Sequence, residues 1–443
     1  MVVGETMFLT GADNQVIAID LHSGDTIWEY RRVVNERIPP CCGRRNRGIA
    51  VLGGRVFHNT LDGRLVALEA RTGRELWNVE VVDYRDNYSM TGAPLATKNG
   101  VVVGVSGGDY GAPGVIDAYD PVSGRRLWRF HTIPQPGQSG HETWPGDNWK
   151  KGGGATWLTG TYDPELGLVY WTVGNPAKIF NPASRPGDNL FTCSVVALDV
   201  KTGTLRWHYQ FTPNDGNDWD ANSMPVLVND QFEGKGRKLM MFASRNCFFY
   251  LLDRETGKFL RATAFCEQNW NDGFTKEGRP IRRPASIPSP SGPLIKPGVT
   301  GGANWMAPSY DVGSSLFIVK NYRGGSRVFS EEGPGVMGGR TEQPLNEPKS
   351  AAVTAIDTRT GAIAWDVEQS GDNNSGILAT ASNLVFTGNS HGHLTVLDTK
   401  TGRELWRYRL GGEISMAPIT YLYNGRQELA VFSGGSLFVF CLQ

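Results

Sequence analysis

The sequence predicts an all-β protein, an eight-bladed β-propeller, on the strength of composition, a recurring motif and the spacing of its copies. The chain has 443 residues, with 56 Gly, 13 Trp and 40% hydrophobic residues. It contains no long Ala-, Glu-, Lys- and Leu-rich stretch of the kind that forms helices. Such a profile is typical of short strands joined by Gly-containing turns, with aromatic side chains between sheets.

The recurring motif is an apolar residue, an acid, two variable residues, Thr or Ser, Gly, three variable residues and Trp. Its copies end at Trp28, Trp77, Trp128, Trp207, Trp365 and Trp406. A seventh copy keeps Asp253 and Gly257 but has Arg261 in place of Trp, and we expect an eroded eighth copy around Asp311.

Each residue of the motif has a physical role in a strand–turn–strand unit. The acid accepts turn N–H groups, Gly takes a positive φ, and the Trp indole fills the seam against the next sheet. We therefore interpret the repeat acids as structural and the tryptophans as docking motifs between blades. The spacing of about 40 residues and more between copies matches one blade plus insertions. These blades predict a single propeller domain over residues 1–443.

The first residues, MVVGETMFL, form a strand pattern without the features of a signal peptide. We therefore expect that an N-terminal strand and a signal peptide are missing from this sequence. No apolar run approaches the length of a transmembrane helix, so no membrane span is expected.

The charge balance and the cysteines narrow the function. Lys plus Arg and Asp plus Glu both number 44, so neither nucleic acid nor an anionic membrane is an expected partner. A small uncharged substrate fits this balance better. The chain has six Cys but no C-x-x-C pair, which argues against structural zinc and covalent haem.

Several segments together carry a family resemblance. In chain order they are CCGRRNRG (41–48), SGGDYG (106–111), GGGATW (152–157), GNP (174–176), NDWDAN (217–222), SRNCFFYLLDR (244–254) and GGANW (301–305). This ordered set resembles the alcohol dehydrogenases that depend on pyrroloquinoline quinone (PQQ). The resemblance covers essentially the whole chain and implies the oxidation of an alcohol to an aldehyde.

The resemblance also implies which residues bind PQQ, a flat tricarboxylate. Trp157 supplies one flat wall, and a disulfide between Cys41 and Cys42 supplies the other. Arg47 and Arg245 match positions that bind the oxygens of PQQ, which suits the planar guanidinium. The cofactor edge is lined by Thr91, Ser106, Gly107 and Gly108, with Asn304 and Trp305 as further contacts. Asn374 stands where the family has a second tryptophan.

A purely structural interpretation remains open for each of these residues. Without the other motifs, two reduced thiols in a loop would be the favoured interpretation of Cys41 and Cys42. Trp157 could be one more seam-filling indole, although it lies outside the repeat. Either arginine alone would usually be a surface or turn residue.

An all-oxygen metal site is implied at matching positions, as a hard cation requires. Its ligands are Asp109, Asn175, Asp218 and Asp220, with Asp109 standing where the family generally has Glu. Asp220 is similar to the extra carboxylate of lanthanide-using members, and we hold calcium and lanthanide open. Asp218 is also the expected general base, taking the hydroxyl proton of the alcohol.

Two further expectations concern partners and location. A separate cytochrome c is the expected electron acceptor because the chain carries no haem motif, and the periplasm is the expected location. The alternative reading is a non-catalytic propeller of the same repeats that acts as a binding or assembly scaffold.

Overall fold

The computed structural model describes residues 1–34, 41–347, 349–371 and 374–441, and these residues are almost entirely strands and loops. The chain divides into two compact units, Met1–Ala221 with Glu331–Gly339, and Asn222–Ser330 with Arg340–Gln443. Among the described residues, no helix has the length and apolar character needed to cross a membrane.

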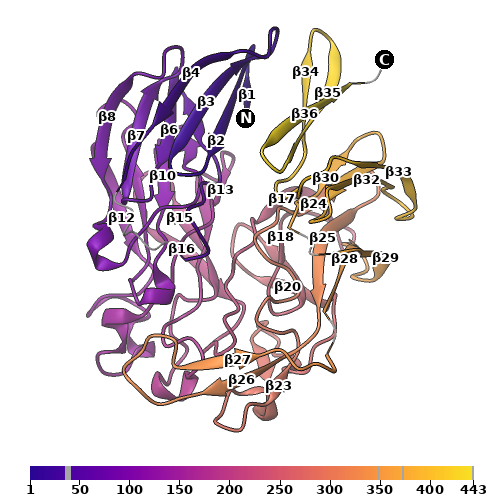
Figure 1. Ribbon diagram of the computed structural model, residues 1–443. Coiled ribbons are helices and arrows are strands. Elements are labelled where there is room, and N and C mark those ends of the chain that lie inside the picture. Colours follow the sequence, from indigo (N-terminus) through magenta and orange to yellow (C-terminus); the bar gives the residue numbers. More distant parts are fainter. Residues whose placement is uncertain (35–40, 348, 372–373, 442–443) are drawn as a thin grey trace. The chain divides into compact units, whose positions relative to one another are not determined.

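The first unit contains four antiparallel sheets of four strands each (Figure 1). Sheet 1 comprises β1 (Val2–Val3), β2 (Thr6–Gly11), β3 (Gln15–Asp20) and β4 (Thr26–Arg31). Sheet 2 comprises β5 (Ala50–Leu52), β6 (Arg55–Asn59), β7 (Arg64–Glu69) and β8 (Glu75–Glu80). Sheet 3 comprises β9 (Leu95–Thr97), β10 (Gly100–Gly104), β11 (Val115–Tyr119) and β12 (Arg126–His131). Sheet 4 comprises β13 (Thr161–Asp163), β14 (Leu168–Thr172), β15 (Ser194–Asp199) and β16 (Leu205–Gln210).

The second unit contains the remaining large sheets. Sheet 5 comprises β17 (Val226–Phe232), β18 (Lys235–Ala243), β19 (Phe248–Asp253) and β20 (Phe259–Ala264). Sheet 6 comprises β24 (Ser309–Asp311), β25 (Leu316–Arg323), β28 (Ser350–Asp357) and β29 (Ile363–Gln369). Sheet 7 comprises β30 (Leu378–Thr380), β31 (Leu384–Gly388), β32 (His393–Asp398) and β33 (Glu404–Arg409). Sheet 8 comprises β34 (Ile419–Tyr423), β35 (Arg426–Ser433) and β36 (Ser436–Cys441).

Short elements lie in the insertions between these strands. The accessory strands are β21 (Asn271–Phe274), β22 (Pro280–Arg282), β23 (Leu294–Ile295), β26 (Ser326–Ser330) and β27 (Gly339–Glu342). The 3₁₀ helices are η1 (Tyr84–Asp86), η2 (Gly108–Tyr110), η3 (His141–Thr143), η4 (Asn148–Lys151), η5 (Pro182–Ser184) and η6 (Pro284–Ser286). Five of these helices, η1 to η5, lie in loops that carry expected site residues.

The sequence repeat forms the last two strands of a sheet and the turn between them. In sheet 1, Asp20 Oδ1 accepts the backbone N–H groups of His22 (2.7 Å) and Ser23 (3.0 Å). Gly24 in the same turn has φ +77°, a conformation that costs Gly little. The structural role expected for the repeat acid is therefore confirmed at Asp20.

Four of the six repeat tryptophans pack against the following sheet within each unit. Trp28 Nε1 donates to the carbonyl oxygen of Ala70 at 3.0 Å, and a Cβ atom at Gly73 would lie 2.6 Å from the Trp28 ring. The same relation joins Trp77 with Gly124, Trp128 with Gly203 and Trp365 with Gly402. The Gly of one repeat therefore makes room for the Trp of the repeat before it.

Arg261 takes over the Trp position in sheet 5. A Cβ atom at Gly361 would lie 2.9 Å from Arg261 Cδ. The Arg261 guanidinium donates to the carbonyl oxygens of Thr358 (3.1 Å) and Arg359 (2.8 Å). Its apolar stem and N–H donors thus replace the indole face and the indole N–H.

The expectation of an eroded eighth repeat around Asp311 is wrong. Asp311 ends β24 and caps the β24–β25 turn, the first hairpin of sheet 6, whose repeat is the copy ending at Trp365. An Asp that caps a tight turn looks the same in sequence at either hairpin.

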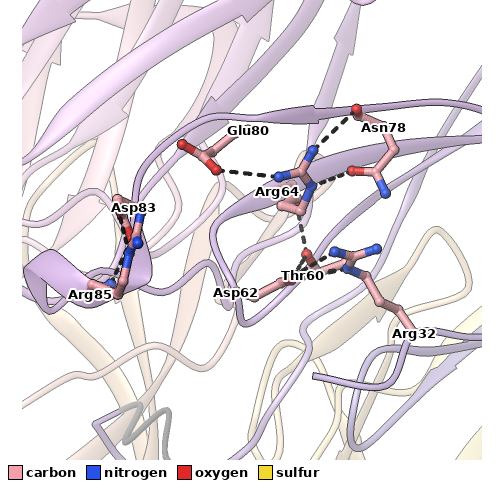
Figure 2. A network of polar contacts seen from close by, with 8 residues as sticks. All are labelled: Arg32, Thr60, Asp62, Arg64, Asn78, Glu80, Asp83 and Arg85. Atoms are coloured by element: carbon pink, nitrogen blue, oxygen red, sulfur yellow. Dashed lines mark hydrogen bonds and ion pairs between the residues drawn. The ribbon is translucent and has the colours of Figure 1, made fainter. Parts of the chain in front are cut away.

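One ion pair connects the end of sheet 1 to the β6–β7 turn of sheet 2, as Figure 2 shows. Arg32 Nη2 lies 2.8 Å from Asp62 Oδ2, and Thr60 Oγ1 donates to Asp62 at 2.5 Å. In the β2–β3 turn, Asn14 Oδ1 accepts the Leu61 N–H at 2.8 Å. These contacts hold the base of the loop that carries Cys41 and Cys42.

Candidate cofactor and metal site

The cysteine loop begins with two sulfur atoms in contact. Cys41 Sγ and Cys42 Sγ are 2.6 Å apart, longer than the roughly 2.05 Å of a disulfide bond. This contact lowers the pKa of Cys42 to about 7 and raises the pKa of Cys41. Cys41 and Cys42 are separate thiols in the structure, so their disulfide stays a prediction.

The disulfide that the structure contains joins Cys247 to Cys266 in the second unit. Sequence analysis missed this pair. The signal was weak, because two cysteines 19 residues apart have no diagnostic spacing unless the strands between them are already placed.

Two backbone anchors fix the rest of the cysteine loop. Arg47 N–H donates to the Thr91 carbonyl oxygen at 3.0 Å. The buried Asn46 side chain donates to the Asn59 carbonyl oxygen (3.0 Å) and accepts the Gly48 N–H (2.8 Å). Asn46 thus ties the loop to β6 of the second sheet, and Arg47 ties it to the loop between β8 and β9.

Trp157, Arg47 and Asp220 form the centre of the site in the first unit. The Arg47 guanidinium carbon lies 4.8 Å from the centre of the Trp157 ring, which is cation–π distance. Trp157 Nε1 donates to Asp220 Oδ2 at 3.1 Å. Burial lowers the pKa of Arg47 to about 10, so Arg47 remains a cation at neutral pH.

Asp220 connects the Trp157 wall to Asn175. Its Oδ1 accepts the Asn175 N–H at 2.5 Å, and both residues are buried. A Cβ atom at Gly174 would lie 2.6 Å from this oxygen, so the Gly of the GNP segment permits the approach. Each carboxylate oxygen has two lone pairs, so an oxygen that accepts a hydrogen bond can also bind a metal ion.

Asp109 lies in η2 and acts electrostatically on the cysteine pair. It raises the pKa of Cys41 through its negative charge and through a hydrogen bond, which are lesser causes than the Cys42 contact and burial. A Cβ atom at Gly153 would lie 3.0 Å from the Asn175 carbonyl oxygen and 3.3 Å from that of Gly108. The peptide before Asp109 therefore lies close to Asn175.

Asp218 is half-buried with φ +61°, in the left-handed region. The side chain of the buried Asp215 accepts the N–H groups of Asn217 (3.2 Å) and Trp219 (3.0 Å), on either side of Asp218. The turn around the expected base is thus shaped by an upstream acid that sequence analysis did not select.

The expected cofactor edge is also present in the first unit. Thr91 Oγ1 and Ser106 Oγ are 2.9 Å apart and buried. A Cβ atom at Gly107 would lie 2.3 Å from the Asn87 carbonyl oxygen, and one at Gly108 would lie 3.0 Å from Ala155 Cβ. No larger residue fits at Gly107 without moving the backbone.

Three expected PQQ contacts belong to the second unit. Arg245 is buried and donates to the Val299 carbonyl oxygen. Asn304 Oδ1 accepts from Asn222 Nδ2 at 2.7 Å and from the Trp305 N–H at 2.8 Å. Asn374 donates to Glu413 (2.9 Å) and accepts from the Tyr322 hydroxyl (3.1 Å). The Asn374 amide is therefore held in a polar network.

A cavity of about 620 Å³ lies in the second unit and was not predicted. It is lined mainly by polar side chains and glycines, including Thr300, Gly301, Tyr322, Asn374 and His391. Thr300 accepts a hydrogen bond from Asn304 (2.8 Å), so the cavity adjoins an expected cofactor residue.

The residues of the first unit fit a flat anionic cofactor and a hard cation. An indole face, a cation and a sulfur pair suit a planar tricarboxylate, and Asn175 and Asp220 offer oxygen donors side by side. Within the described ranges, no three His, Cys, Asp or Glu side chains gather closely enough to hold an ion by themselves. The protein donor set therefore needs the Asn175 amide and oxygens from the cofactor itself.

The chain matches two family models. That of the glucose, ethanol and alcohol dehydrogenase β-propeller domain, named PQQ, covers residues 1–264. That of the outer membrane protein assembly factor BamB covers residues 349–437.

Curated relatives resemble the chain over nearly its whole length. Quinoprotein alcohol dehydrogenase PedH of Pseudomonas putida is 38% identical, with 97% of this chain covering 77% of that protein. The lanthanide-dependent methanol dehydrogenase of Methylacidiphilum fumariolicum is 34% identical, with 98% and 77% covered. Quinohemoprotein alcohol dehydrogenase ADH IIB of Pseudomonas putida is 35% identical, and this chain spans 65% of its length.

Solved structures of similar proteins also match the chain over nearly its whole length. The quinohemoprotein alcohol dehydrogenase of Comamonas testosteroni has a TM-score of 0.93 at 32% identity, with 98% of this chain and 70% of that chain covered. A europium-containing methanol dehydrogenase has a TM-score of 0.89 at 32% identity, with 98% and 81% covered. BamB of Moraxella catarrhalis, at 14% identity and a TM-score of 0.55, shows a likeness of fold alone.

Proposed function

We propose that this chain, which belongs to the family of PQQ-dependent quinoprotein alcohol dehydrogenases, oxidises a small alcohol to its aldehyde at the Trp157 site. The observation that carries this proposal is the contact chain from Arg47 over Trp157 to Asp220 and Asn175. It joins residues from four separate segments in one place, which turn formation alone does not require.

Each residue has a distinct task in this proposal. Arg47 provides a partly buried cation for the carboxylates of PQQ, and Trp157 provides a flat surface whose orientation Asp220 fixes. Asp109, Asn175, Asp218 and Asp220 supply oxygen ligands to calcium or a lanthanide. When bound, PQQ supplies a two-electron acceptor and the metal ion supplies a Lewis acid.

Asp218 is the proposed general base. Its carboxylate accepts the hydroxyl proton of the alcohol, and the left-handed turn set by Asp215 keeps it in a fixed orientation. In the second unit, Arg245, Asn304 and Trp305 stay the expected cofactor contacts. Cys41 and Cys42 are joined as a disulfide in this proposal. A periplasmic location and a cytochrome c acceptor belong to the same proposal.

The test is a dye-reduction assay on the purified protein with PQQ, an alcohol and either Ca²⁺ or La³⁺. We expect PQQ-dependent turnover with at least one of the two ions. Asp218→Asn should lower kcat by about 100-fold or more while PQQ binding, followed by fluorescence quenching, is unchanged. Asp220→Ala should abolish the lanthanide-supported rate if a lanthanide is the native ion.

A scaffold function is the second candidate, and the match of residues 349–437 to the BamB model favours it. The same assay separates the two. If the protein neither binds PQQ nor turns over an alcohol with either ion, the result contradicts the dehydrogenase and supports the scaffold.

A further inference from the structure

The two loops that carry the proposed metal ligands are joined by a buried arginine that the proposed chemistry does not use. Asn175 lies in the loop after β14, and Asp218 lies in the loop after β16. Arg185 belongs to the first of these loops and is 1% exposed. Its position between the loops places a full positive charge in the interior of the first unit.

The Arg185 guanidinium donates to both loops. In its own loop it donates to the carbonyl oxygens of Lys178 (3.2 Å) and Ile179 (3.2 Å) and to Asn189 Oδ1 (2.8 Å). Across to the second loop it donates to the carbonyl oxygen of Asp215. This planar fork of donors thus fixes the separation of the two loops.

A second contact between the loops runs in the opposite direction. Asn214 Nδ2 donates to the Arg185 carbonyl oxygen (3.0 Å) and to Asn189 Oδ1 (3.0 Å). Asn214 has φ +48°, which Asn tolerates better than most residues. The two loops are therefore cross-linked by side chains of both.

Asp215 passes this restraint on to Asp218. Its carbonyl oxygen accepts from Arg185, while its carboxylate accepts the N–H groups of Asn217 and Trp219. Asp215 is 0% exposed, so water does not compete for these bonds. One residue therefore sets both the distance of the second loop and the turn at Asp218.

We propose that Arg185 and Asp215 are positioning residues that hold Asn175 and Asp218 at the separation required to share one metal ion. The inference rests on the proposed function, because it takes these two residues as metal ligands. Arg185 and Asp215 contact neither metal nor substrate and act through the two loops.

The test measures Eu³⁺ bound together with PQQ, by luminescence titration and by emission lifetimes in H₂O and D₂O. We expect Arg185→Lys and Asp215→Ala to weaken Eu³⁺ binding by about 10–100-fold. We also expect an additional coordinated water, because one protein ligand no longer reaches the ion. Asn217 and Trp219 donate to different oxygens of Asp215, so Asp215→Asn keeps an acceptor for one of the two N–H groups and should restore part of the affinity.

Arg254→Lys is the matched control. Arg254 is 5% exposed in the second unit and donates to the Val228 carbonyl oxygen at 2.7 Å. This variant should lose stability without any change in Eu³⁺ hydration. Equal losses of affinity and equal hydration changes in Arg254→Lys and Arg185→Lys would overturn the positioning role.

The outcomes also separate this proposal from the proposed function. If the wild-type protein with PQQ gives no saturable Eu³⁺ emission, the positioning role fails. If it also shows no turnover with Ca²⁺ or La³⁺, the proposed function fails as well. If the wild type binds Eu³⁺ but Asp215→Ala and Asp215→Asn match it in affinity and hydration, only the positioning role fails. If Arg185→Lys does not fold, the comparison of Asp215→Ala with Asp215→Asn tests the positioning role.

Discussion

His58 on β6 is fully buried beneath the cysteine loop, where its Nδ1 lies 3.4 Å from Asn46 Nδ2. Burial lowers its pKa from 6.5 to about 4, outweighing the opposing effects of the Asn14 backbone and of Asp62. Between pH 6.5 and 4 the histidine is therefore mainly neutral in the folded protein, whereas in the unfolded chain it is mainly protonated.

This burial predicts a specific loss of stability in acid. Between pH 6.5 and 4 the unfolded state binds more protons at this residue, so the free energy of unfolding falls as pH falls. The loss attributable to His58 reaches about 3 kcal/mol near pH 4. Urea unfolding of His58→Gln should show a shallower decline over this window than the wild type, whereas the exposed His22→Gln should not. Parallel pH profiles for wild type and His58→Gln would contradict the prediction.

The contacts of several single residues could not be predicted from the sequence. Trp157 and Asp220 were selected by resemblance, but the hydrogen bond between them depends on how the loops fold. Arg185 and Asp215 carry no motif, and an isolated Arg or Asp in a loop is usually a surface residue. Their importance follows only from burial and from the partners they reach.

At the scale of elements, the repeat predicted the last two strands of a sheet and their turn, because it encodes turn chemistry directly. The first two strands of each sheet have no such marker. For the same reason the hairpin capped by Asp311 was mistaken for a repeat, and the accessory strands of the insertions were not predicted.

Two repeat glycines allow the Trp–Gly packing to be measured. Gly24 and Gly73 hold the same motif position with φ +77° and +70°. A Cβ atom at Gly24 meets nothing within 4 Å, whereas one at Gly73 would lie 2.6 Å from the Trp28 ring. Only Gly73 therefore combines the backbone requirement with a packing requirement.

We expect Gly24→Ala to cost about 1–2 kcal/mol, from the left-handed backbone alone. Gly73→Ala should cost about 1–3 kcal/mol more, because the added methyl group must displace the Trp28 indole. Chemical denaturation of both variants, with indole fluorescence as the probe, measures the difference. Equal costs would show that the seam accommodates the added methyl group without displacing the Trp28 indole.

At the scale of the whole molecule, the predicted fold class is confirmed by the eight large sheets and by the solved propeller structures that the chain resembles. The sequence could predict this because copies of one motif at blade spacing leave few other architectures. It could not predict the grouping into two compact units, since Glu331–Gly339 joins the first unit from within the sequence of the second. That segment contacts the Asn175 loop through the Ile179 and Phe180 N–H groups.

The cysteines give a prediction that depends on the complete chain. Six cysteines include the Cys247–Cys266 disulfide and the separate Cys193 and Cys441. If Cys41 and Cys42 form a disulfide in solution, alkylation of the denatured, unreduced protein should label two thiols, and otherwise it should label four. Cys41→Ser distinguishes the two cases. If the wild type has the disulfide, the variant frees Cys42 and the count rises from two to three. If the wild type has two thiols, the variant loses one and the count falls from four to three. Mass spectrometry measures both counts. A fall in the number of labelled thiols would contradict the disulfide and remove the sulfur wall from the proposed cofactor site, while Trp157 and Arg47 would remain part of it.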